Sequence, residues 1–210
     1  MSTLAGKGLL AAIPVAGVAG TGAYFGLVKS SNSKETIKSK LELSLKGKAR
    51  KILTSKTDVI WEKYKVLYEK SSQKISGVNK NELPNWCSTT LEKEYSDKES
   101  SLYDNASKWC VANTNTLKKE LESEKRITFL TFEDGSDSKW QQAWTKYESE
   151  KASLTITDDS LKNLNPNDAN TGGPKLKEWC KAKLEKYMYE DLGEEKVEDK
   201  VSKYCVERKD

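Results

Sequence analysis

The sequence contains no histidine, and this absence excludes several kinds of site at once. Ser-His-Asp and Cys-His catalysis both use an imidazole as general base, and many zinc sites use it as a ligand. Four cysteines leave a Cys₄ zinc site to consider, but they lie far apart and not in close C-x₂₋₄-C pairs. We therefore expect no metal, no cofactor and no catalytic residue, and we interpret the chain as a non-enzyme.

Hydrophobic residues are also scarce, at 36% against 32% charged residues. An apolar run at the N-terminus uses part of that 36%, so the core of the rest must be thin and built from Trp, Tyr and Leu. Of the 36 Lys and Arg, only Lys7 precedes residue 29, while all 32 Asp and Glu follow it. After residue 29 the positive and negative side chains are interleaved along the chain. Such interleaving is typical of solvated helix surfaces, so we expect no nucleic-acid partner.

Charge is missing altogether between Gly8 and Val28. A helix of that length spans about 31 Å, close to the thickness of a bilayer core. We expect a membrane anchor over residues 1–29, and Gly22 and Gly26 form a small-xxx-small pattern that predicts weak self-association through this helix. The predicted anchor residues are Gly8, Leu9, Leu10, Ile13, Val15, Val18, Tyr24, Phe25, Leu27 and Val28. The alternative is a cleaved secretory signal with Leu9–Ala19 as its apolar region, which would release a secreted form.

Two features of the sequence give opposite predictions for the side of the membrane on which the C-terminal part lies. Lys29, Lys34, Lys38 and Lys40 follow the apolar run, and basic residues favour the cytoplasmic side. The cysteines favour the outside, because disulfides persist in oxidising compartments. We give the cysteines more weight and expect a single-pass protein of the cell membrane with its C-terminal part extracellular.

Two blocks of the chain resemble each other and contain all four cysteines. Leu83-Pro-Asn-Trp-Cys87 corresponds to Leu176-Lys-Glu-Trp-Cys180, and Trp109-Cys-Val111 corresponds to Tyr204-Cys-Val206. The two cysteines are 23 positions apart in the first block and 25 in the second. Trp-x-Lys-Tyr precedes each block, at residues 61–64 and 144–147. The chain is therefore predicted to contain two copies of one helical repeat.

We expect an all-α fold, with a linker and membrane-proximal helix over 30–51, repeat 1 over 52–125 and repeat 2 over 126–210. Residues 127–132 alternate like a strand, but without an evident partner we expect a packed connector. Residues 163–174 are expected to form a polar loop that only the second copy has. The predicted repeat core consists of Trp61, Tyr64, Trp86, Leu91, Trp109, Trp144, Tyr147, Trp179, Leu184 and Tyr204.

The four cysteines allow three disulfide pairings. Duplication favours Cys87 with Cys110 and Cys180 with Cys205, because each copy would then be self-contained. Each bond would cross a helix hairpin, and the turn of the second hairpin is expected at residues 191–193. The alternative is four reduced thiols packed as small apolar groups.

The Gly/Ala-rich N-terminal run, Trp-x-Lys-Tyr, Leu-x-x-Trp-Cys and the final aromatic-Cys-Val together resemble large paralogous families of uncharacterised proteins in haemotropic mycoplasmas. The resemblance covers most of the chain. It implies a membrane-associated or surface protein, and it transfers no catalytic or binding residue.

Two classes of function follow from these features. The first is an anchored helical module that contacts a host-cell surface or another surface protein, or serves a structural role. The second is an enzyme based on carboxylates, and none of these stands in an apolar setting that would raise its pKa. We therefore favour the interaction or structural module.

Overall fold

The computed structural model describes residues 34–125 and 127–207. The predicted anchor, from Gly8 to Val28, lies outside this range. Among the helices of these two ranges, none combines the length and the hydropathy that crossing a bilayer requires.

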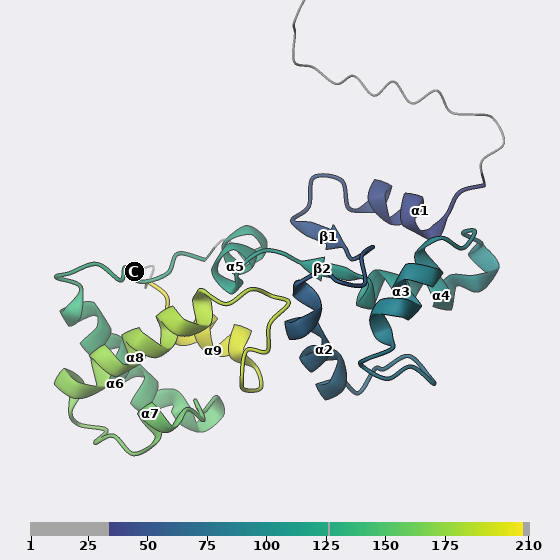
Figure 1. Ribbon diagram of the computed structural model, residues 1–210. Coiled ribbons are helices and arrows are strands. Elements are labelled where there is room, and N and C mark those ends of the chain that lie inside the picture. The colour runs from purple at the N-terminus through teal and green to yellow at the C-terminus, as the bar shows by residue number, and fades with distance from the viewer. Residues whose placement is uncertain (1–33, 126, 208–210) are drawn as a thin grey trace, which may run out of the picture. The chain divides into compact units, whose positions relative to one another are not determined.

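Helices dominate the described residues, as expected, but the all-α prediction needs one correction. Two short strands, β1 (Arg50–Ile52) and β2 (Val111–Asn113), pair antiparallel with Ile52 opposite Val111. Two 3₁₀ turns cover Asp97–Glu99 and Lys151–Ser153. The α-helices of the described part are α1 (Ile37–Ser44), α2 (Ile60–Lys70), α3 (Leu83–Leu91), α4 (Ser100–Trp109), α5 (Leu117–Lys125), α6 (Asp137–Glu150), α7 (Asp159–Lys162), α8 (Ala169–Leu184) and α9 (Val197–Tyr204) (Figure 1).

The buried side chains of the described residues form two hydrophobic clusters, one per copy. Ile37 and Leu41 of α1 belong to the first cluster, with residues of α2, α3 and α4. Leu117 and Leu121 of α5 belong to the second, with residues of α6 to α9. The helix expected within 30–51 is present as α1, but it packs into the first cluster, and α5, which the predicted boundaries assign to the first repeat, packs into the second cluster.

A shared backbone contact explains why α1 and α5 each begin a copy. Ile37 donates its amide to the carbonyl of Lys93 at 2.9 Å, and Leu117 donates to Lys186 at 2.8 Å. Lys93 and Lys186 stand six residues after the first cysteine of their copies. Each copy thus starts with a helix whose first residue is hydrogen-bonded just beyond the end of the helix that contains the first cysteine, α3 or α8. We call residues 35–113 the first copy and residues 115–207 the second copy.

In both copies the C-terminal end pairs with the segment that precedes α2 or α6. Leu53 donates its amide to the carbonyl of Cys110 at 2.8 Å, and Leu130 donates to that of Cys205 at 2.9 Å. Phe129 forms an isolated antiparallel bridge with Val206. The alternating segment 127–132 therefore has a strand partner after all, and that partner is the residue that follows the last cysteine.

The predicted polar loop over 163–174 is wrong at its C-terminal end, because α8 begins at Ala169. The side chain of Asp168 caps this helix by accepting from the amide of Thr171 at 3.1 Å. A Cβ atom added at Gly172 would lie 2.2 Å from the indole of Trp144. The glycines thus allow α8 to pack tightly against α6, and this tertiary contact outweighs their poor helix propensity.

The Trp-x-Lys-Tyr motif aligns Trp61 with Trp144, but the structure aligns Trp61 with a residue one helical turn earlier. The indole of Trp61 donates to the carbonyl of Ser55 at 2.8 Å, and it is Trp140 that makes the equivalent bond, to Thr131 at 2.9 Å. At the other end of the helix, Tyr68 meets Trp109 edge-on at 84°, as Tyr147 meets Tyr204 at 86°. Position 61 therefore corresponds to 140, and 68 to 147.

Candidate functional site

Both expected disulfides are present. Cys87 bonds to Cys110 with their Cα atoms 5.4 Å apart, and Cys180 bonds to Cys205 with a separation of 5.9 Å. All four residues are fully buried. Since every cysteine sulfur is used in a disulfide, none is available as a thiolate ligand, and the Cys₄ zinc site is excluded.

The two bonds cross pairs of helices, although the hairpins are looser than expected. Cys87 lies within α3 and Cys180 within α8, so neither opens its helix, while Cys110 and Cys205 directly follow α4 and α9. The connection between α8 and α9 is an irregular segment over 185–196. Gly193 does adopt a left-handed conformation there, with φ of 87°, but well beyond the end of α8.

Most of the predicted core residues lie buried in the two clusters. The exception is Trp86, which is only partly buried and packs against the first cluster. The buried ones are Trp61, Tyr64, Leu91 and Trp109 in the first copy, and Trp144, Tyr147, Trp179, Leu184 and Tyr204 in the second. The indole nitrogen of Trp144 has no hydrogen-bond partner within the described part of the chain.

A buried ion pair joins the two copies. Glu120 of α5 is 5% exposed, and its carboxylate accepts from Arg50 of β1 at 2.5 Å and from the side chain of Asn115 at 2.6 Å. Burial opposes ionisation of Glu120, but the hydrogen bonds from Arg50 and Asn115 prevail and lower its pKa. Sequence reasoning missed this pair. A signal was present in the residue type, because only three of the 36 basic residues are Arg and Arg50 is one of them.

A second buried charge cluster belongs to the second copy alone. The carboxylate of Glu194, with its side chain 4% exposed, lies 2.6 Å from the ammonium of Lys200 and 3.7 Å from that of Lys183. The indole of Trp179 donates to it at 3.0 Å. The residue of the first copy that corresponds to Lys183 is Thr90, so the first copy lacks this arrangement. Nothing in the sequence distinguishes these lysines from surface ones.

These carboxylates are arranged as structural ion pairs. Burial opposes ionisation of Glu194, yet hydrogen bonds from Lys200, Thr157 and Trp179 outweigh it and lower the pKa of the carboxyl. A lowered pKa is opposite to what a general acid at neutral pH needs. Within residues 34–125 and 127–207, no three acidic or cysteine side chains gather as they would around a metal ion.

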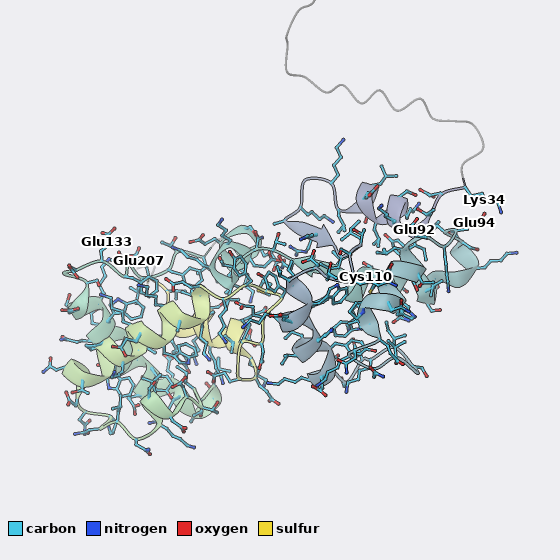
Figure 2. The ribbon with its side chains drawn as sticks, in the orientation of Figure 1. Lys34, Glu92, Glu94, Cys110, Glu133 and Glu207 are labelled. Atoms are coloured by element: carbon cyan, nitrogen blue, oxygen red, sulfur yellow. A yellow bond between two sulfur atoms is a disulfide. The ribbon has the colours of Figure 1, made fainter. Side chains whose placement is uncertain are left out.

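An open groove of about 340 Å³ lies on the second copy, beside Tyr204. We call it the Tyr204 groove. Its apolar lining comes from α6 and from two paired segments, one before α6 and one after α9, through Ala143, Leu130 and Val206. Glu207, which Figure 2 labels, stands at the end of the second of these segments.

The polar lining of the Tyr204 groove is mainly basic. Its charged members are Lys139, Lys146, Lys203 and Glu207. Lys139 pairs with Glu207 at 2.7 Å, and Lys203 pairs with Glu150, outside the groove, at 3.2 Å. Lys146 instead donates to the carbonyl of Lys203 at 3.3 Å, so its charge is met by no carboxylate among the described residues.

Comparison with protein-family models, curated proteins and solved structures found no match to this chain. The function proposed below therefore rests on the residues and the geometry already described.

Proposed function

We propose that the protein is a membrane-anchored helical surface protein whose two copies lie outside the cell and act as an interaction or structural module. The observation that carries this proposal is the pair of disulfides, one closed within each copy. Structural disulfides of this kind are formed and kept in oxidising surroundings, and they are rare where thiols are kept reduced.

The N-terminal run supports the anchor in the same proposal. Gly8–Val28 carries no charge and has the length of a membrane-spanning helix, while the copies themselves are rich in surface charge. The resemblance to mycoplasma surface families agrees with this arrangement. A secreted form after cleavage of the N-terminal segment is the alternative.

The surface of the copies favours contact with a partner over chemistry on a substrate. The buried carboxylate of Glu120 is neutralised by Arg50, and that of Glu194 by Lys183 and Lys200. The Tyr204 groove is open, partly apolar and rimmed by lysines. Such a groove suits a segment of another macromolecule.

The test is protease treatment of intact cells that produce the protein. We expect the epitopes of residues 34–207 to disappear while a cytoplasmic marker protein survives. The intact chain should also partition into the detergent phase. Full protection of the copies until the cells are permeabilised would place them inside and overturn the proposal.

A further inference from the structure

The Tyr204 groove of the second copy lies where the first copy has a buried tyrosine side chain. In the first copy the position of Ala143 is occupied by Tyr64, because 61 corresponds to 140 and 68 to 147 along the same helix. Tyr64 is 7% exposed. The second copy therefore has a methyl group where the first has a buried phenol.

The contacts of Tyr64 define the space that is left open. Its hydroxyl lies 2.8 Å from the carbonyl oxygen of Lys108 and 2.9 Å from that of Val111, and its ring is 6.0 Å from that of Trp109. Lys108, Trp109 and Val111 correspond to Lys203, Tyr204 and Val206. These three residues line the Tyr204 groove.

We propose that the Tyr204 groove binds a tyrosine side chain of a partner protein, carried on an acidic segment. The phenol would take the place that Tyr64 fills in the first copy and would donate its proton toward the carbonyls of Lys203 and Val206. This inference rests on the proposed function, since it names the chemistry of the partner that the surface module contacts.

The acidic surroundings of the tyrosine follow from the charges of the groove. Three of its four charged side chains are lysines. Lys139 and Lys203 form ion pairs with carboxylates, whereas Lys146 donates a hydrogen bond to a backbone carbonyl. An acidic residue next to the tyrosine would supply the missing counter-charge. A phosphate on the phenol would remove the donated proton and face two carbonyl oxygens, so the tyrosine must be unmodified.

The experiment uses the purified full chain and a blocked, fluorescently labelled peptide, Glu-Asp-Tyr-Asp-Glu, with anisotropy as the readout. We expect saturable binding that weakens as salt rises. The peptide with Phe should bind about tenfold more weakly, because the hydrogen bond of the phenol is lost. The phosphotyrosine peptide should not bind. Equal binding of the Phe or the phosphorylated peptide would overturn the proposal.

Two variants locate the site. Ala143→Tyr places the chain's own phenol in the groove, as in the first copy, and should abolish binding while thermal unfolding stays cooperative. Lys146→Gln should weaken binding about tenfold, on the scale of one charged hydrogen bond, whereas Lys63→Gln, which removes the same charge from the first copy, should leave it unchanged. Should Lys63→Gln weaken binding as much, the effect is one of net charge and the groove is not the site.

Two further outcomes separate this inference from others. If the chain forms dimers without peptide and Ala143→Tyr breaks them, the occupant is a second copy of the chain and the partner proposal is overturned. If the peptide fails to bind while protease still removes the copies from intact cells, the groove inference fails and the proposed function stands.

Discussion

Arg50 and Glu120 connect the two copies directly, because both terminal nitrogens of the guanidinium face the carboxylate, at 2.5 and 3.4 Å. Replacing Arg50 by Ala would leave a buried carboxylate with Asn115 but without its cation. We expect the free energy of unfolding to fall by about 3 kcal/mol, as is usual when one partner of a buried pair is removed. Urea denaturation of the full chain measures this.

The matched control for Arg50 is Lys34, whose exposed ion pair with Glu94 has a similar distance of 2.7 Å; both residues are labelled in Figure 2. Lys34→Ala should cost less than about 1 kcal/mol, because solvent screens both charges. Equal losses in the two variants would mean that burial of Glu120 carries no energetic weight.

Removal of either disulfide should destabilise its own copy. Each bond closes a loop of similar length, with its cysteines 23 or 25 positions apart, for which the chain-entropy model gives about 3.5 kcal/mol. The double variants Cys87→Ser with Cys110→Ser, and Cys180→Ser with Cys205→Ser, should each lower the melting temperature. Peptide mapping without reductant should recover only the two within-copy links, and a link between Cys87 and Cys180 would contradict the structure.

Gly172→Ala should destabilise the second copy, because the new methyl group would meet the Trp144 indole at 2.2 Å. Overpacking of this kind costs about 1–3 kcal/mol, even though Ala has the better helix propensity. Glu178→Ala, at an exposed site on the same helix, should change stability by less than about 0.5 kcal/mol. Thermal unfolding distinguishes the two, and a stabilised Gly172→Ala variant would show that propensity outweighs the contact.

Stability should fall in acid partly through Glu194. Its pKa is lowered on folding, so its contribution is present above the ordinary carboxyl pKa of 4.5 and is lost as the pH falls through the lower folded value. Glu194→Gln leaves Lys183 and Lys200 buried without their anion and should cost about 3 kcal/mol at pH 7. The difference between wild type and variant should shrink at pH 3, while the exposed Glu195→Gln should be neutral at both. A difference that stays constant with pH would exclude this role.

The sequence predicted the helical class and the cysteine pairing because duplicated motifs impose the same contacts twice. It misaligned α2 and α6 by one helical turn, because the Trp-x-Lys-Tyr motif matches Trp61 with Trp144 and not with Trp140. Residues one turn apart lie on the same face of a helix, so both alignments bury a tryptophan. The structure resolves the alignment through Trp140, which repeats the hydrogen bond of Trp61.

The start of each copy was beyond the reach of sequence comparison. Helices α1 and α5 share little besides two apolar positions, Ile37 and Leu41 against Leu117 and Leu121. Their equivalence lies in backbone bonds to Lys93 and Lys186, which no side-chain pattern records. The charge cluster around Glu194 was missed for a similar reason, because paired buried lysines look like surface lysines in a sequence.

Because each disulfide lies within a single copy, it also limits how far that copy can extend when the chain is stretched. A protein held by one end at a membrane and by a partner at its surface is loaded in series along its backbone. The 23- and 25-residue intervals closed by the bonds cannot extend. At about 3.5 Å per residue, and after subtraction of the 5.4 and 5.9 Å that already separate the bonded Cα atoms, they withhold roughly 75 and 82 Å of contour length. Single-molecule stretching should therefore show two short unfolding steps, each of which lengthens by that amount once a reductant opens the bonds.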